Sequence, residues 1–447
     1  MSYFQDASPE SLGISSGGIL RFLDRMEKKN IELHSFMVVR HGKCAAKGWW
    51  KPYAPTLPHP LYSFGKTLTA TAIGFARQEK ILSLEERLVD LFPELLPKEP
   101  SENLQKVTLW HLLTMSCGHE TEIDMESPDW IREFLQHPFL HEPGTFYKYN
   151  TAGTNMLAAV LKRKTGCDVT EFLKPRLLEP LGITSLTCSK CQGPEAVEMA
   201  GGGMQMTTED MARFIYFVLN RGRWEGRQLL EEEWFDLACT KQIETAGDAE
   251  GHVKEWAYGY GFQCWMCRTP GSFRADGAFG QFGVVLPDKD LFVILTTGTY
   301  QTQDELDGIF EEIVPTLTDS AQEASAAADV LKERTGQLTI KAGALSEKIH
   351  HIAIIGSDYE RSRHFYVDLL GFKVIRENYR KERDDYKIDL ACGTQEIELF
   401  IIKNAPAHVN YPEALVLRHL VFKVKSVDDT VKELNGKGIE TEPVRLD

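Results

Sequence analysis

The chain has 447 residues, of which 43% are hydrophobic, and this is the composition of a folded protein long enough for two or more domains. Its formal net charge of −15 argues against nucleic acid or an anionic membrane as a partner. The first residues lack the basic and apolar regions of a secretory signal, and no run approaches the ~18 apolar residues that would cross a bilayer. Nine scattered cysteines favour reduced thiols, so the sequence predicts a cytoplasmic protein.

The beginning of the chain predicts a sheet with helices packed on it. Apolar residues at helical spacing over 15–28 predict a helix. Residues 34–50 form two strand-like runs around a His-Gly-Lys turn, which predicts a β-hairpin. Strands placed before a long buried helix indicate a layered α/β arrangement.

Ser63 and Lys66 form the first pair of residues that suggests chemistry. They stand three residues apart at the start of an Ala-, Thr- and Leu-rich run over 61–76, which predicts a buried helix with both side chains on one face. A serine hydroxyl needs an adjacent base, and a lysine serves as one only when burial or nearby positive charge lowers its pKa. The stretch therefore predicts a nucleophile, its base and an oxyanion donor at a helix start, although Ser-x-x-Lys also occurs by chance.

A tyrosine on a loop forms the second cluster. Residues 142–153 contain a Pro-Gly turn, and the next helix is expected to begin near Asn150 or Thr151. Tyr149 thus comes just before a helix, where its side chain can be held toward a cleft. The alternative is an interfacial tyrosine whose hydroxyl is simply hydrogen-bonded.

A glycine-containing hairpin over 273–297 forms the third cluster. Its small residues, among them Gly277, allow another group to approach the backbone. An edge strand of this kind can offer a backbone N–H as a second oxyanion donor. Alternatively, the glycines are only turns and bulges.

The three clusters occur in an order that resembles the serine β-lactamase and penicillin-binding-protein superfamily, most closely its class C and esterase branch, over residues 10–317. Ser63 and Lys66 match the family's Ser-x-x-Lys motif. Tyr149 and Thr151 stand at its Tyr-x-Asn motif, with threonine in the place of asparagine, and the Lys-Thr-Gly strand matches 275–277. The resemblance implies an α/β (α+β) fold, with an antiparallel sheet between helices and an all-helical subdomain.

The resemblance also implies a mechanism and a substrate class. Lys66 and Tyr149 would share the proton of Ser63, and the N–H groups of Ser63 and Ala278 would receive the oxyanion, without a metal or other cofactor. The motif's lysine is replaced by alanine, and Asp276 follows it, so carboxylate-bearing β-lactams are expected to be poor substrates. The expected substrate is a small neutral or cationic ester or amide, with weak or absent β-lactamase activity.

The composition changes after residue 317. Residues 318–334 are rich in Ala, Ser and Glu and predict a helix, and 335–346 read as a linker. The sequence therefore predicts a hydrolase domain over 1–317, a helix and linker over 318–347, and a separate domain over 348–447.

The last domain contains a weak internal repeat of a strand, a helix and a glycine, with a histidine at the start of each strand. It resembles the vicinal oxygen chelate superfamily, which includes glyoxalase I and bleomycin-resistance proteins, and a βαβββ unit is expected. The resemblance implies a divalent metal (Zn, Ni, Mn or Fe) bound by His351, Glu398 and His419. A fourth ligand has no counterpart, because the domain is expected to be truncated at its C-terminus.

Three functions remain open on the sequence alone. The first is a serine hydrolase with an accessory C-terminal module, and the second is a silent binding scaffold. The third is a metal-dependent lyase or dioxygenase of glyoxalase type in the C-terminal domain. The oligomeric state is also open, a homodimer included.

Overall fold

The structure is a computed structural model that divides into two compact units, Met1–Ala342 and Gly343–Asp447. The residues that it describes are 2–123, 125, 127–193, 196–245, 255–322, 325–338, 351–356, 358–381, 384–392 and 395–401.

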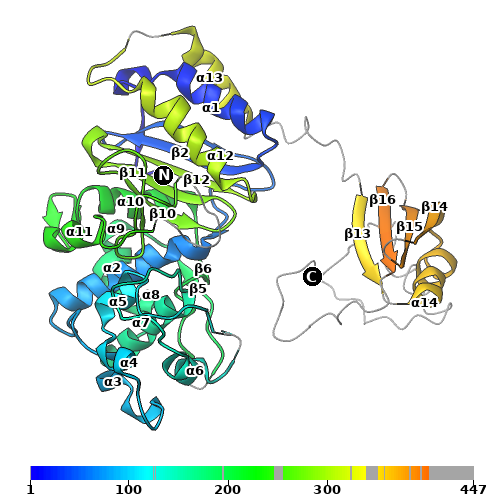
Figure 1. Cartoon of the computed structure of the whole chain (residues 1–447). Coiled ribbons are helices and arrows are strands. Elements are labelled where there is room, and N and C mark those ends of the chain that lie inside the picture. The colour runs from blue at the N-terminus through cyan, green and yellow to red at the C-terminus, as the bar shows by residue number, and fades with distance from the viewer. Residues whose placement is uncertain are drawn as a thin grey trace. The chain divides into compact units, whose positions relative to one another are not determined.

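The first unit is built on a seven-stranded sheet in the order β1-β3-β2-β12-β11-β10-β9 (Figure 1). Its strands are β1 (Gln5–Asp6), β2 (Leu33–Arg40), β3 (Lys43–Trp49), β9 (Trp265–Met266), β10 (Phe273–Gly277), β11 (Gln281–Leu286) and β12 (Leu291–Thr297). All neighbours pair antiparallel except β1 and β3. Strands from both ends of the unit thus meet at the β2–β12 pair.

Both faces of this sheet are buried. Phe36 and Val38 of β2 contribute to one hydrophobic core, and Met37 and Val39 contribute to the other, as the alternation of side chains along a strand requires. Helices α1 (Ser16–Lys28), α12 (Thr302–Gly308) and α13 (Ala326–Leu338) cover the first face, and α2 (Gly65–Gln78) and α10 (Thr208–Leu219) cover the second (Figure 1). The expected sheet with helices on both sides is confirmed.

A helical subdomain extends from the α2 side of the sheet (Figure 1). Its helices are α3 (Leu88–Leu91), α4 (Glu102–Lys106), α5 (Leu109–Leu113), α6 (Trp130–Gln136), α7 (Thr151–Thr165), α8 (Val169–Leu173), a π-helical turn (Lys174–Leu178) and α9 (Glu179–Leu181). Helix α11 (Glu232–Ala238) follows α10, and short paired strands complete the unit: β4 (His59–Pro60), β5 (Thr187–Cys188), β6 (Met204–Met206), β7 (Arg223–Trp224) and β8 (Arg227–Gln228). Because α7 packs against both α2 and α5, the subdomain brings the Tyr149 loop to the start of α2.

Helix α13 begins and ends later than the sequence suggested. It runs over Ala326–Leu338 and packs on α1 and β3 of the first unit. Arg334 fixes it there by pairing with Asp24 and Glu27 of α1. The helix therefore belongs to the first unit and continues past the residue at which the linker was expected to begin.

The second unit has the expected βαβββ order over its described residues. It comprises β13 (His351–Gly356), α14 (Tyr359–Arg363) with a π-helical continuation (His364–Leu369), β14 (Lys373–Arg380), β15 (Asp385–Cys392) and β16 (Gln395–Ile401). The sheet order is β13-β16-β15-β14, with β13 and β16 parallel. A small core of Ile and Leu side chains forms on β15 and β16. The predicted second half of the repeat lies outside the described residues.

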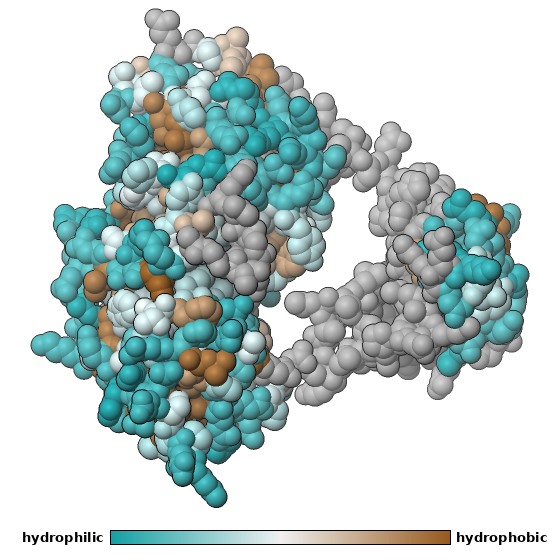
Figure 2. Space-filling model, viewed as in Figure 1, coloured by the Kyte–Doolittle hydropathy of each residue, from teal (hydrophilic) through white to brown (hydrophobic). Residues whose placement is uncertain are grey.

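Hydrophilic side chains dominate the face of the first unit that Figure 2 shows, and hydrophobic residues occur there in small separate groups. Among the described helices, none is long and apolar enough to span a bilayer.

Candidate active site

Ser63 lies in a short 3-10 turn (η2, Tyr62–Phe64) that leads directly into α2. The turn holds the serine just before the helix, whereas Lys66 stands in the first turn of α2 itself. The two side chains meet, with 2.9 Å between Lys66 Nζ and Ser63 Oγ. The sequence spacing therefore brings the proposed nucleophile and base into hydrogen-bond contact.

Lys66 is buried, with 1% of its surface exposed. Its Nζ also contacts the Gly201 carbonyl oxygen and lies 3.3 Å from Thr151 Oγ1. Burial lowers the pKa of Lys66 to about 7, against the opposing effect of the Glu122 and Asp276 carboxylates. A large fraction of Lys66 is thus neutral near pH 7.

The three neighbours of Lys66 also orient its nitrogen. A neutral amine has two N–H groups and one lone pair. The Gly201 carbonyl can only accept a hydrogen bond, and the Thr151 hydroxyl can accept the second. The lone pair is then left for the Ser63 hydroxyl, which is the arrangement that a general base requires.

Tyr149 is the second side chain in contact with Ser63. Its hydroxyl is hydrogen-bonded to Ser63, and Lys66 Nζ stands 5.0 Å from the centre of its ring. Trp265 stacks on the same ring at 5.8 Å and 14°. Burial raises the pKa of Tyr149 far above its usual value, and the hydrogen bond between Tyr149 and Ser63 offsets only part of this rise. Tyr149 therefore stays a phenol and can donate a proton.

Thr151 is the first residue of α7, which is capped by the Asn150 side chain through the Gly153 N–H. The backbone N–H of Thr151 donates to Glu122 Oε1 at 2.9 Å. Asn155 of the same helix accepts from the Gly201 N–H at 2.8 Å and so fixes the carbonyl that Lys66 contacts. Glu122, Asn155 and the Gly201 carbonyl could not be recognised as site groups from the sequence, because only tertiary packing brings them to Lys66.

The end of β10 comes close to the backbone of the nucleophile turn. A Cβ atom placed on Gly277 would lie 2.2 Å from the Leu61 carbonyl oxygen and 3.1 Å from the Phe64 nitrogen, so only glycine fits there. Ala278 follows directly and is exposed. Beneath this turn, Gln281 Nε2 donates to the carbonyls of Ala278 and Thr297 at 3.1 and 2.8 Å. The hairpin thus supports the segment expected to supply the second oxyanion donor.

Asp276 has a positive neighbour that the sequence prediction did not consider. Its Oδ2 accepts from Arg274 Nε at 2.8 Å, and the Arg274 side chain is fully buried. The carboxylate itself is 12% exposed. The negative charge of Asp276 is therefore paired with a positive charge on the same strand.

We expect the rate of ester hydrolysis, as kcat/KM, to rise with pH through about 7, because Lys66 must lose its proton to act as a base. Glu122→Gln should move this rise to lower pH, since the carboxylate stabilises protonated Lys66 and the amide keeps an acceptor for Thr151. Glu120→Gln, an exposed neighbour on the same segment, is the control and should leave the profile in place. An unchanged profile in Glu122→Gln would show that this rise does not report on Lys66.

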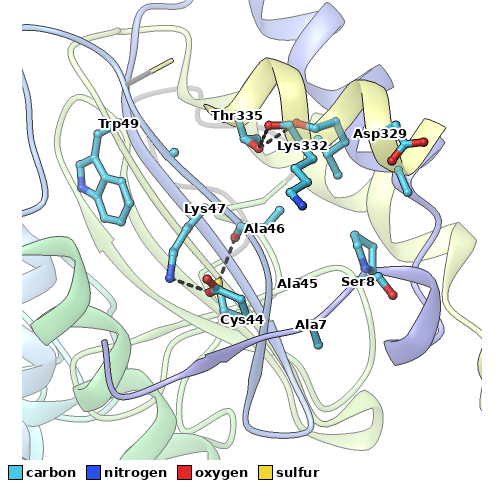
Figure 3. Close-up of a pocket in the computed structure, with 15 residues that line it drawn as sticks. Ala7, Ser8, Cys44, Ala45, Ala46, Lys47, Trp49, Asp329, Lys332 and Thr335 are labelled. Atoms are coloured by element: carbon cyan, nitrogen blue, oxygen red, sulfur yellow. Dashed lines mark hydrogen bonds and ion pairs between the residues drawn. The ribbon is translucent and has the colours of Figure 1, made fainter. Parts of the chain in front are cut away.

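A cavity of about 620 Å³ lies elsewhere in the first unit, between the β1–β3 edge and α13 (Figure 3). Ala7, Cys44, Ala46 and Trp49 line its sheet side, and Lys332 belongs to its helix side. None of the Ser63 site residues lines it.

In the second unit, the proposed metal ligands are only partly described. His351 pairs with Glu396 across β13 and β16, and Glu398 follows two residues along β16, so positions 351 and 398 belong to adjacent paired strands. His419 lies outside the described residues. Among the side chains that the structure describes, no group of three His, Cys, Asp or Glu is placed to hold a metal ion.

Comparison with known proteins agrees with both domains. Residues 21–312 match the model of the Beta-lactamase family, and residues 348–445 match the Glyoxalase/Bleomycin resistance protein/Dioxygenase superfamily. The protein YwkD of Bacillus subtilis is 57% identical over 104 residues, which are 23% of this chain and 81% of that protein.

Two further relatives concern the hydrolase domain. Lovastatin esterase of Penicillium rubens is 28% identical over 151 residues, 28% of this chain and 38% of the esterase. The solved structure of EstCE1, a hydrolase with promiscuous acyltransferase activity, superposes with a TM-score of 0.53 at 15% identity, covering 66% of this chain and 98% of that one. At this identity the superposition shows a shared fold. The chain belongs to the β-lactamase family, and it carries a C-terminal domain of the glyoxalase and bleomycin-resistance superfamily.

Proposed function

We propose that the first domain is a serine hydrolase that cleaves small esters or amides through an acyl-enzyme. The observation that carries this proposal is the contact of Ser63 with both a buried Lys66, whose pKa is about 7, and a phenolic Tyr149. A silent scaffold has no need to bury an amine beside a serine, because desolvation of the amine costs stability. The similarity to an esterase supports the same activity.

The mechanism follows from the protonation states. Neutral Lys66 accepts the Ser63 proton as Oγ attacks the substrate carbonyl, and the N–H groups of Ser63 and Ala278 stabilise the oxyanion. Tyr149 donates its proton to the leaving alcohol or amine and is reprotonated through Lys66. Water then attacks the acyl-enzyme by the reverse proton path. Thr151 holds Lys66 in position with its hydroxyl.

A fluorophosphonate probe tests the proposed activity directly, because it reacts covalently with activated serines. Labelling of the full chain, with the adduct located on Ser63 by peptide mass spectrometry, is the expected result. The probe should label more slowly below pH 7, where Lys66 is protonated. A chain that is neither labelled nor active on a panel of neutral esters and amides is a scaffold and not a hydrolase.

We expect neutral esters to be preferred over carboxylate-bearing analogues of equal size, by about two- to fivefold, since Asp276 retains part of its field despite Arg274. Asp276→Asn removes the carboxylate that is hydrogen-bonded to the buried Arg274 and should narrow or reverse this preference. Asp288→Asn removes an exposed carboxylate from the β11–β12 turn and serves as the control. Equal kcat/KM ratios in wild type and Asp276→Asn would overturn the electrostatic assignment and return β-lactams to the candidate substrates.

For the C-terminal domain we propose a divalent-metal site formed by His351, Glu398 and His419. The pairing of β13 with β16 supports it, because positions 351 and 398 are two residues apart in register and so share one face of the sheet. Imidazole and carboxylate are donors that suit Zn, Ni, Mn and Fe. A bound cation would act as a Lewis acid toward a substrate oxygen. The side chains of this set would hold the ion and leave a position open.

The metal proposal predicts about one divalent ion per chain after incubation with metal and dialysis. His351→Ala should weaken retention by ~10-fold or more, because one of three ligands is lost. His364→Ala is the control, since His364 is exposed on the helical segment and contacts Asp368. The metal content of each variant is measured by mass spectrometry. Equal metal retention in wild type and His351→Ala would exclude this ligand set.

We also propose that the protein acts in the cytoplasm on a small-molecule substrate. Every cysteine whose side chain the structure describes is a free thiol, which suits a reducing compartment.

A further inference from the structure

Three aromatic side chains form a continuous series beside the catalytic serine. The ring centres of Tyr62 and Phe279 are 5.0 Å apart at an interplanar angle of 59°, and those of Phe279 and Tyr300 are 4.9 Å apart at 68°. These edge-on and tilted contacts are favourable aromatic geometries. We call Tyr62, Phe279 and Tyr300 the aromatic wall.

Two residues of the aromatic wall are direct sequence neighbours of Ser63 and Ala278. Tyr62 directly precedes Ser63 in η2, and Phe279 directly follows Ala278 in the β10–β11 turn. The close approach at Gly277 brings these two segments together. The Phe279 carbonyl accepts from Thr297 Oγ1 at 2.6 Å and from the Thr299 N–H at 3.3 Å, so its ring stands on a fixed turn.

Two residues of the aromatic wall, Tyr62 and Phe279, have a backbone conformation that favours glycine. Tyr62 has φ +48° and Phe279 has φ +62°, a left-handed conformation that is unusual for bulky residues. Such conformations cluster at functional sites, where the fold maintains them at a cost in stability. Burial of the rings in a hydrophobic core does not offset this cost, because Tyr62 and Phe279 are only half-buried and Tyr300 is 87% exposed.

We propose that the aromatic wall binds the acyl part of the substrate and selects large apolar, preferably aromatic, acyl groups. This inference rests on the proposed serine hydrolase activity. The wall extends from the two residues that supply the oxyanion donors. Tyr149, which protonates the leaving group, instead belongs to a second aromatic group with Trp265 and Tyr260. The two groups thus divide the ester into an acyl side at the wall and an alcohol side at Tyr149.

Glycine substitution offers a clean test, because glycine fits the left-handed backbone while it removes the ring. Wild type, Phe279→Gly and Tyr300→Ala are compared on p-nitrophenyl phenylacetate and p-nitrophenyl acetate, which share a leaving group. The kcat/KM ratio of phenylacetate to acetate should fall about tenfold in Phe279→Gly and about threefold in Tyr300→Ala. Val330→Ala, which shortens an exposed side chain on α13, should leave the ratio unchanged.

A second series keeps the phenylacetyl group and compares the phenyl with the methyl ester. A change in this ratio without a change in the acyl ratio would overturn the assignment of the wall to the acyl side. Fluorophosphonate labelling of Ser63 separates the two levels of the proposal. If the variants are labelled and keep the wild-type ratio of phenylacetate to acetate turnover, only the acyl-binding role of the aromatic wall is wrong. If the wild type shows neither labelling nor turnover, both the hydrolase activity and the role of the wall are wrong.

Discussion

Ser63→Ala is expected to abolish ester hydrolysis, with a loss in kcat on the order of 10⁴–10⁶-fold, the range seen when a catalytic nucleophile is deleted. The reason is that no acyl-enzyme can form without Oγ, whereas the oxyanion donors and the aromatic wall stay in place. The alanine variant should therefore still bind substrate. Turnover of a chromogenic ester and labelling by the fluorophosphonate probe measure the loss independently.

The fold should tolerate this change. Ser63 Oγ contacts Lys66 and Tyr149, and these two side chains keep their contacts with other residues when Oγ is removed. Ser83→Ala, a surface serine shortly after α2, is the matched control and should keep wild-type activity. If the Ser63→Ala protein has the wild-type unfolding midpoint and keeps more than about a tenth of its activity, the nucleophile lies elsewhere.

Local spacing explains why the Ser63–Lys66 pair could be predicted from the sequence. Residues three apart at a helix start share one face, and this holds although Ser63 lies in a 3-10 turn and not in α2 itself. The hairpin around Gly277 was also predictable, because its glycine and alternating apolar residues define its register. In these places the local pattern and the tertiary structure require the same geometry.

The neighbours of Lys66 could not be predicted in this way. Glu122 and the Gly201 carbonyl reach the site from segments 56 and 135 positions away, and their own sequences carry no sign of it. Their positions depend on how α7 packs against α2. The pKa of Lys66 is consequently a tertiary property, set by burial and by these groups.

The ion pair between Asp276 and Arg274, in contrast, could have been predicted from the sequence. Arg274 and Asp276 are two residues apart on one strand and must therefore share a face. The alternation that placed the core residues of β2 also predicts this ion pair. Because Arg274 pairs with Asp276, the expected preference for neutral over anionic substrates is only modest.

The acid–base pair gives the second large expected effect. Lys66→Met should lower kcat by ~10²–10⁴-fold, because methionine fills the same buried space without a proton-accepting nitrogen. The buried amine no longer has to be desolvated, so the unfolding midpoint should stay equal or rise. The rise in activity through about pH 7 should disappear together with the base.

Tyr149→Phe should cost a similar ~10²–10⁴-fold, since it removes the phenolic proton donor that is hydrogen-bonded to Ser63. Tyr147→Phe makes the same chemical change within the same aromatic cluster and is the control, with a loss of less than about fivefold expected. The double variant Lys66→Met/Tyr149→Phe decides how the two groups work. Because both act on the single Ser63 proton, its loss should be far smaller than the product of the two single losses. Losses that multiply would show that Lys66 and Tyr149 act in separate steps, and the shared-proton mechanism would then be wrong.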